Sequence, residues 1–313
     1  MKVVTSAPAK VILFGEHAVV YGEPAIATAL DIRVRASVEE ADERYIEAYA
    51  LGKPVSDLKP IEAILAKVEA DYGLKLRVRI DSDIPLGAGL GSSAASAVAV
   101  SAGVSKILKG ELDKEFIVSL ADIAEEIAHG KPSGIDTRIT TYGGTMLYIR
   151  GEKPTFTDKL SGGITIADTG IPRSTRELVL GVKSLKERIP PVNKAIEAIG
   201  DLVRRVRKRL EAETKLEDLK EESRINHGLL RSIGVSHPAL DKLVRIAKSN
   251  GYGAKLTGAG GGGSAIGFGD LREIRREALE EIGNLYNTRP RMLKTTVGAE
   301  GVRLEGRFLH PKI

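Results

Sequence analysis

The chain has 313 residues, more than a single domain usually contains, and its 42% hydrophobic content can fill sizeable cores, so we expect two domains. Its 47 basic and 42 acidic side chains give a net charge of +5, which suits an anionic small molecule, whereas an aromatic content of only 4% argues against a nucleic-acid partner. The absence of cysteine excludes disulfides and thiolate chemistry, and the lack of a signal peptide or a run of transmembrane length predicts a cytoplasmic protein with no membrane partner.

The first 40 residues predict three short strands. Residues 3–5 and 11–14 are apolar or β-branched, and we expect two strands there, joined by a turn over residues 6–10. Residues 32–38 alternate between apolar side chains and arginines, a period of two that is typical of a half-buried strand.

A polar cluster lies between these strands. Glu16 and His17 are bracketed by Gly15 and Gly22 and are close in sequence to Lys10. Such an arrangement is expected at the mouth of a site, although His17 taken alone would better fit a structural histidine. The cluster as a whole favours the functional interpretation.

A helix over residues 60–72 and a strand over residues 74–81 lead to a glycine-rich stretch that opens a second helix, over residues 92–104. The free N–H groups and positive dipole end of a helix start favour a phosphate, and glycines let the chain turn its amides inward. The alternative is a plain turn with Ser92 as an ordinary N-cap. The predicted phosphate-binding segment consists of Pro85, Leu86, Gly87, Ala88, Gly89, Leu90, Gly91, Ser92, Ser93, Ala94 and Ala95.

Residues 113–128 predict an amphipathic helix with acidic side chains in its last turn. Its expected core stripe consists of Phe116, Leu120, Ile123 and Ile127. Glu125 and Glu126 oppose the negative end of the helix dipole and therefore need compensation, from solvent or from a divalent metal. The next segment, residues 130–137, contains two glycines and a proline, and we expect a loop that presents the carboxylate of Asp136.

The second half mixes strands and helices again. A strand over residues 141–149 and a polar stretch over residues 151–163 end the first half, so we predict domains of residues 1–160 and 161–313. The basic run over residues 204–209 is interpreted as a solvated helix face. The remaining predicted elements are a strand over 164–167, helices over 192–210, 216–232, 238–249 and 271–286, and strands over 292–297 and 302–304 that complete a second sheet.

A second glycine-rich segment covers residues 255–264. Its glycines formally match the dinucleotide fingerprint G-x-G-x-x-G, but that fingerprint must follow a strand and open a helix. Here the glycines lead into the strand-like residues 265–268. We therefore predict a loop that closes over a ligand.

Three motifs, in this order, resemble those of the GHMP kinase superfamily. They are Pro8-Ala9-Lys10-Val11 with Gly15-Glu16-His17, residues 85–95, and residues 255–263. Within the superfamily, residues 13–22 and 130–136 are similar to the mevalonate kinase family in particular. Ala9 and Leu86 stand where relatives often have Gly and Pro, a departure that affects no catalytic group.

The resemblance implies an α+β fold of two domains. The N-terminal domain would be like ribosomal-protein domain 2, with an unusual left-handed crossover, and the C-terminal domain would be ferredoxin-like. The implied reaction is the ATP-dependent phosphorylation of (R)-mevalonate to 5-phosphomevalonate, with Mg²⁺, in isoprenoid biosynthesis. The implied partners are mevalonate and ATP, with a homodimer as the candidate assembly.

The resemblance also implies roles for individual residues. Asp136 would be the catalytic base and Lys10 its charge partner, while Ser93 and Glu125 would be the magnesium ligands. Phosphoryl transfer needs mainly positioning and charge neutralisation, which these groups would supply. The implied substrate-binding residues are Lys10, Glu16, His17, Tyr21, Asp136, Thr257 and Gly258.

Two alternatives share much of this pattern. One is a catalytically silent nucleotide-binding or sensor protein on the same fold, against which the joint presence of Lys10, Ser93, Glu125 and Asp136 argues. The other is a kinase with a different acceptor, of which phosphomevalonate is the first to exclude. A Walker-type ATPase is ruled out, because the chain contains no G-x-x-x-x-G-K-[ST] motif.

Overall fold

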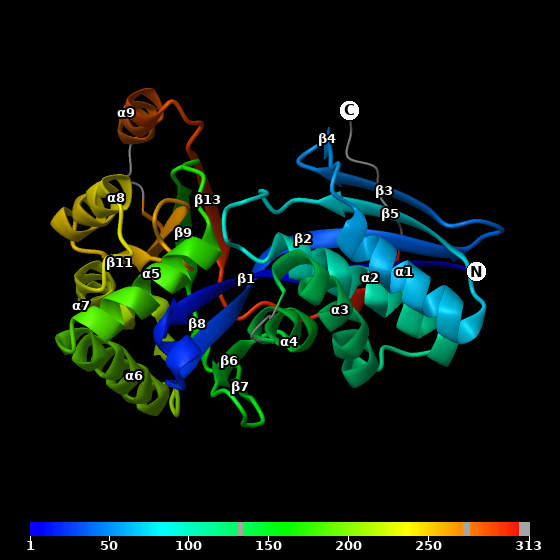
Figure 1. Cartoon of the computed structure of the whole chain (residues 1–313), viewed down its shortest axis with the longest axis horizontal. Coiled ribbons are helices and arrows are strands. Elements are labelled where there is room, and N and C mark those ends of the chain that lie inside the picture. The colour runs from blue at the N-terminus through cyan, green and yellow to red at the C-terminus, as the bar shows by residue number, and fades with distance from the viewer. Residues whose placement is uncertain (131–133, 272–275, 307–313) are drawn as a thin grey trace.

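The computed structural model describes residues 1–130, 134–271 and 276–306. Figure 1 shows two sheets toward opposite ends of the molecule, each accompanied by helices. Strands β1 (Lys2–Phe14) and β2 (Ala25–Glu40) form a long antiparallel pair that extends from the first sheet toward the second. Within the described ranges, no helix is long and apolar enough to cross a membrane.

The first sheet has the strand order β14-β1-β2-β5-β3-β4, with β6 paired to β2 and β7 paired to β6. In the described ranges four helices accompany it, and the helix that the first glycine-rich stretch opens packs on both β1 and β2. The further strands are β3 (Tyr45–Ala50), β4 (Lys53–Pro54), β5 (Leu76–Ser82), β6 (Thr145–Tyr148), β7 (Thr155–Thr157) and β14 (Arg303–Leu304). The helices are α1 (Lys59–Tyr72), α2 (Ser92–Lys109), α3 (Lys114–His129) and α4 (Ile135–Tyr142).

Small residues on α2 allow a very close approach to the sheet. A Cβ added at Gly103 would stand 2.4 Å from Cγ2 of Val38 on β2, closer than real Cβ atoms come to their neighbours. The small residues of α2 therefore let this helix pack closely on β2. This packing brings the start of α2, and with it the first glycine-rich loop, next to β1.

The predicted turn over residues 6–10 is wrong, because β1 is one continuous strand. The register between β1 and β2 shifts between Pro8 and Ala9, so a β-bulge accommodates the proline that lacks an N–H donor. The same irregularity changes which side chains of β2 point into the protein. Arg33 is only 4% exposed, and its guanidinium donates to the carbonyl oxygens of Ser6, Glu300 and Gly301.

The predicted stripe of α3 is rotated from the observed one. The fully buried face consists of Ile117, Leu120, Ala121 and Ala124, whereas Ile127 is 56% exposed. Alanines on this face let α3 approach α2 closely, so the packing follows residue size rather than the largest apolar side chains. The rotation places Glu125 on the inner face, at 3% exposure.

The second sheet has the order β11-β12-β9-β13 and is antiparallel throughout. Its predicted helices are confirmed, except that residues 216–219 form a 3-10 turn before α7. The start of the predicted helix over 271–286 includes residues 272–275, which lie outside the described residues. The elements are β9 (Gly163–Asp168), α5 (Thr175–Arg188), α6 (Pro191–Arg209), η2 (Leu216–Leu219), α7 (Lys220–Ser232), α8 (Pro238–Ser249), β11 (Gly253–Leu256), β12 (Ser264–Phe268), α9 (Arg276–Tyr286) and β13 (Arg291–Thr296), beside a small pair of β8 (Leu160–Ser161) and β10 (Thr214–Lys215).

The two sheets share one apolar core at their junction. Phe14 of β1 packs edge-to-face on Phe268 of β12, with ring centroids 5.9 Å apart. One prediction fails here, since β14 pairs with β1 and so joins the first sheet, not the second. The domain boundary between residues 160 and 161 stays a prediction.

Candidate active site

Lys10 and Asp136 form an ion pair, with 2.9 Å between Nζ and Oδ2. Lys10 comes from β1 and its side chain is 7% exposed, whereas that of Asp136 is 31% exposed. The predicted loop at Asp136 is wrong, because Asp136 lies in the first turn of α4. Gly134 in the left-handed conformation starts this helix, and Gly143 ends it, which also shortens the predicted strand over residues 141–149. The helix presents a partly accessible carboxylate beside a buried cation.

The first glycine-rich loop lies directly on Lys10. The backbone N–H of Lys10 donates to the carbonyl oxygen of Leu90 at 2.9 Å. Gly87, Gly89 and Gly91 all have positive φ, so the loop uses conformations that favour glycine. Gly91 is the N-cap of α2 and no side chain caps this helix, so Ser92 is not an N-cap. The N–H groups of the first turn of α2 thus have no side-chain cap.

The proposed metal ligands come from two packed helices. Ser93 is half-buried in the first turn of α2, Glu125 is buried on α3, and these helices pack on each other. In the described part of the chain, no three carboxylate or imidazole side chains gather as a metal site. One hydroxyl and one carboxylate still fit Mg²⁺, which prefers oxygen ligands and is usually held by one or two carboxylates plus phosphates and water.

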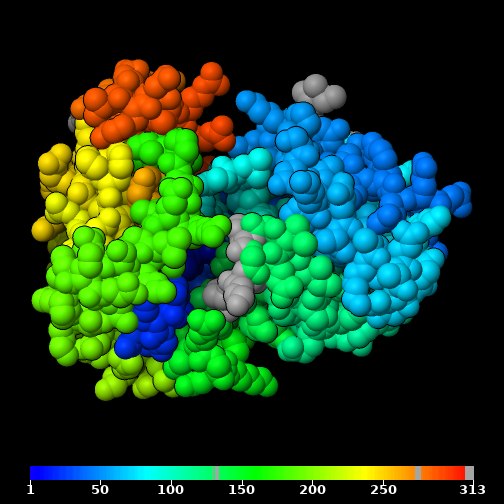
Figure 2. Space-filling view, viewed as in Figure 1, coloured from blue at the N-terminus to red at the C-terminus, as the bar shows by residue number. Residues whose placement is uncertain are grey.

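The second glycine-rich loop connects β11 and β12, and it faces the first. Its glycines lead into a strand, as the sequence predicts. At its base, the hydroxyl of Thr257 donates to the carbonyl oxygen of Ile12 at 2.9 Å. The hydroxyl of Ser264 donates to the carbonyl oxygen of Ala88 at 2.8 Å, which joins the two loops. Figure 2 shows a hollow in the middle of this face, with N-terminal residues in dark blue at its floor.

His17 connects the N-terminal segment to the second loop. Its Nε2 lies 2.9 Å from the carbonyl oxygen of Ala259. A carbonyl oxygen only accepts, so Nε2 carries the proton and, in the neutral ring, Nδ1 is an acceptor. Burial lowers the pKa of His17, against smaller opposing effects of this hydrogen bond and of Glu16. His17 is therefore held neutral in one tautomer.

Glu16 belongs to a buried ion pair with Lys255 that was not predicted from the sequence. Nζ of Lys255, a residue with 0% exposure, donates to Oε1 of Glu16, and Nδ2 of Asn226 donates to Oε2 at 3.2 Å. Burial lowers the pKa of Lys255, although Glu16 opposes the shift. Both oxygens of Glu16 are thus engaged within the protein.

Tyr21 lines a pocket that none of the other predicted site residues lines. This pocket has a volume of about 250 Å³ and is also lined by Lys183, Lys186, Glu187 and Asn193. Nζ of Lys186 stands 4.6 Å from the centroid of the Tyr21 ring. Neither Lys10 nor Asp136 lines this pocket.

Arg173 lies between the two glycine-rich loops. It was not predicted from the sequence as a site residue. A Cβ added at Gly263 would stand 1.0 Å from Nη1 of Arg173, and one at Gly89 would stand 2.4 Å from Nη2. Burial lowers the pKa of Arg173, with Asp168 acting in the opposite direction. Nη1 of Arg173 is buried and has no hydrogen-bond partner among the described residues, which points to an anion as its partner. The only signal in the sequence is a lone arginine shortly after β9.

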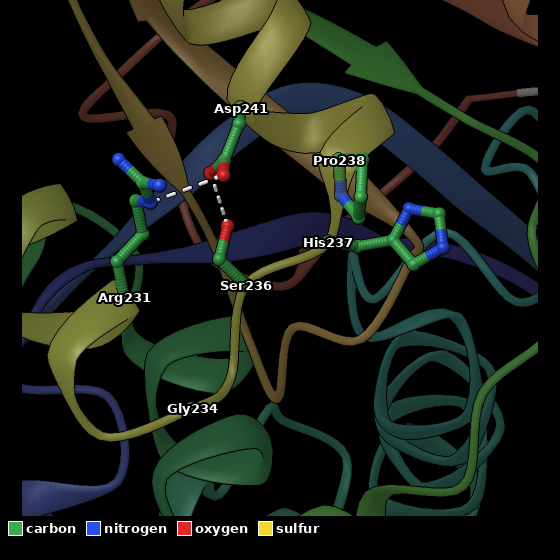
Figure 3. A pocket seen from close by; sticks show the side chains of 6 residues that line it. All are labelled: Arg231, Gly234, Ser236, His237, Pro238 and Asp241. Atoms are coloured by element: carbon green, nitrogen blue, oxygen red, sulfur yellow. Dashed lines mark hydrogen bonds and ion pairs between the residues drawn. The ribbon is translucent and has the colours of Figure 1, made fainter.

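A different pocket, of about 200 Å³, lies at the start of α8 (Figure 3). Its polar groups are already paired, since Asp241 accepts from Ser236 and forms an ion pair with Arg231 at 3.0 Å. None of the predicted site residues lines it. The chemistry of Lys10 and Asp136 therefore lies elsewhere.

Comparison with known proteins identifies the family. Residues 59–144 match the model of the GHMP kinases N terminal domain, and residues 188–288 match that of the GHMP kinases C terminal. The mevalonate kinase of Pyrococcus horikoshii is 40% identical over 97% of this chain and 98% of its own length. That of Archaeoglobus fulgidus is 38% identical over 85% and 92%.

Solved structures agree with this result and bear out the fold that the resemblance implied. The mevalonate kinase of Methanococcus jannaschii has a TM-score of 0.77 and 27% identity, with 96% of this chain and 99% of that chain covered. The L. major mevalonate kinase in complex with R-mevalonate has a TM-score of 0.77 and 26% identity, with 96% and 97% covered. The chain belongs to the mevalonate kinase family of the GHMP kinases.

Proposed function

We propose that this chain transfers the γ-phosphoryl group of ATP to the primary hydroxyl of (R)-mevalonate and releases 5-phosphomevalonate and ADP. The observation that carries the proposal is the ion pair of Lys10 and Asp136 beside the glycine-rich start of α2. Membership of the mevalonate kinase family over nearly the whole chain supports this acceptor. The reaction belongs to isoprenoid precursor synthesis.

The phosphates of ATP would lie against residues 85–95. The free N–H groups of the first turn of α2 and the positive dipole end of this 18-residue helix favour them there. Arg173 approaches this loop from the second half of the chain and would neutralise charge on the transferring group. Closure of the two loops on each other would exclude water from the phosphates.

Asp136 would accept the proton of the attacking hydroxyl. The hydroxyl oxygen forms a bond to the γ-phosphorus, the bond to the β–γ bridging oxygen breaks, and ADP leaves with that electron pair. Lys10, whose Nζ lies 2.9 Å from Oδ2 of Asp136, would orient this carboxylate for the proton transfer. The same ammonium group would stabilise the developing alkoxide.

Ser93 and Glu125 would hold Mg²⁺ through one hydroxyl and one carboxylate oxygen. When bound, the ion supplies charge neutralisation at the β- and γ-phosphates. The buried setting of Glu125 keeps this carboxylate from being hydrated by bulk water. The burial therefore strengthens its attraction for a cation.

The acceptor would lie toward the segment of His17 and the second loop. Nδ1 of neutral His17 accepts a hydrogen bond, which suits a hydroxyl of mevalonate. Thr257 and Gly258 are proposed to line the same side, and Lys10 would contact the primary hydroxyl. Glu16 would act by fixing His17, and Tyr21 stays a predicted contact.

A coupled assay of ADP release with mevalonate, phosphomevalonate, homoserine and galactose tests this function. We expect turnover with mevalonate and a product phosphorylated at the primary hydroxyl. Turnover with phosphomevalonate alone, or ATP binding without transfer to any acceptor, would contradict the proposal. Light scattering and cell fractionation test the predicted homodimer and the cytoplasmic location.

A further inference from the structure

Asp122 joins the helix of the proposed metal ligand to the helix of the proposed base. It lies on α3, three residues before Glu125. Its Oδ1 accepts a hydrogen bond of 2.6 Å from the hydroxyl of Thr137, and its Oδ2 lies 3.7 Å from Nη1 of Arg138. Thr137 and Arg138 are the two residues that follow Asp136 on α4. Asp122 thus contacts α4 at the turn that carries Asp136.

The start of α4 has no side-chain cap of its own. Its N-cap is Gly134, with φ of 75°. The guanidinium of Arg138 folds back and donates to the carbonyl oxygen of Gly134 at 3.1 Å. Asp122 faces this same guanidinium. Its carboxylate therefore contacts both Arg138, which supports the start of the helix, and the buried hydroxyl of Thr137, the residue next to Asp136.

We propose that Asp122 is a positioning residue for phosphoryl transfer, acting through the first turn of α4 to aim Asp136 at Lys10 and the acceptor hydroxyl. The proposal rests on the proposed function of Asp136 as base. Without the Asp122 carboxylate, the hydroxyl of Thr137, a residue that is 1% exposed, loses its partner inside the protein. The turn then shifts to satisfy this hydroxyl, and a misplacement of about 1 Å at a catalytic group can cost on the order of 10²-fold in rate.

The first test is the turnover of Asp122→Ala and Asp122→Asn. Asp122→Ala is expected to lower kcat about 10- to 100-fold, while the KM for ATP changes little, because the turn is displaced and the glycine-rich loop is not. Asp122→Asn keeps an oxygen for Thr137 and is expected to recover most of the lost turnover. A kcat of Asp122→Ala equal to that of the wild type, in folded protein, overturns the proposal.

A matched control breaks a different contact between the same two helices. The hydroxyl of Tyr142, at the far end of α4, donates to Glu115 at the beginning of α3. Glu115→Ala should lower the stability of the helix pair with little change in kcat. If Glu115→Ala lowered kcat as much as Asp122→Ala, a general loosening of α4 would explain both, and the positioning role would be wrong.

The decisive measurement uses the Asp136→Asn background. A residue that acts only through the Asp136 carboxylate has nothing left to position there, so Asp122→Ala should cost little further turnover in Asp136→Asn protein. Full additivity of the two losses overturns the proposal. Failure of the proposed function is distinguishable, because the wild-type protein would then not phosphorylate mevalonate at all.

Discussion

The side chain of Lys10 crosses directly over Gly91: a Cβ added at Gly91 would stand 2.7 Å from Cγ of Lys10 and 2.9 Å from its Cε. The cation that pairs with Asp136 is thus held in place by the residue that starts α2. The phosphate-binding segment and the catalytic pair are one packed unit. A substitution in the phosphate-binding segment should therefore also affect the pair of Lys10 and Asp136.

Gly91→Ala should lower turnover more than Gly87→Ala does. Both glycines have positive φ, 73° and 77°, so both substitutions carry a similar backbone penalty. A Cβ at Gly87 has nothing within 4 Å, whereas one at Gly91 displaces Lys10. Steady-state kinetics of the two variants measure the difference. Equal losses of kcat would show that the contact with Lys10 does not matter.

Asp136→Asn should cost at least about 10²-fold in kcat, because the amide cannot take the hydroxyl proton. ATP affinity, measured by calorimetry, should stay close to that of the wild type, since the glycine-rich loop is untouched. Near-normal turnover in folded Asp136→Asn protein would remove Asp136 as base and shift attention to Lys10.

Glu125→Gln should raise the Mg²⁺ concentration needed for half-maximal activity sharply, because a neutral amide is a weaker ligand than a carboxylate. Glu126→Gln is the matched control, since the neighbouring Glu126 is exposed while Glu125 is buried. The readouts are Mg²⁺ titration of the rate and Mn²⁺ binding followed by paramagnetic resonance. If both variants titrate like the wild type, Glu125 is not a ligand.

His17→Ala should raise the KM for mevalonate more than that for ATP. The substitution removes the Nδ1 acceptor on the acceptor side and also the tie to Ala259, while the phosphate-binding segment keeps its contacts. A site that hydrogen-bonds its substrate discriminates strongly when one partner is lost. An increase confined to the KM for ATP would place His17 on the nucleotide side, and phosphate on the tertiary hydroxyl, seen by NMR, would contradict the proposed orientation of mevalonate.

The free energy of unfolding should decrease as the pH falls below the ordinary histidine pKa of 6.5. Burial lowers the folded-state pKa of both His17 and His227, so below 6.5 the unfolded chain binds more protons than the native one. Their contribution is fully present above that pH and is lost as the pH falls through the lowered values. Urea denaturation across this range measures the slope, and His17→Gln should reduce it. An unchanged slope would contradict the lowered pKa of His17.

Several local features of this protein follow from its residues alone. The glycines of residues 85–91 and the small side chains of α2 have a conformational meaning of their own, so a phosphate-binding helix start could be predicted before any fold was known. The same holds for the glycines of residues 258–263, which lead into a strand. Resemblance of the ordered motifs then supplied the family and the pairing of Lys10 with Asp136, which the structure places 2.9 Å apart.

Which groups meet one another depends on how the whole chain folds. Arg173 reaches two glycine-rich loops that are far from it along the chain, and Lys255 finds Glu16 across 239 residues. The periodicity of a sequence predicts which side chains share one face of an element, but not which element packs on that face. The orientation of α3 that buries Glu125 depends on how closely its alanines approach α2. For the same reason the alternation of residues 32–38 does not show that Arg33 is buried beside the bulge at Pro8, where the carbonyl groups of residues 300–301 accept from its guanidinium.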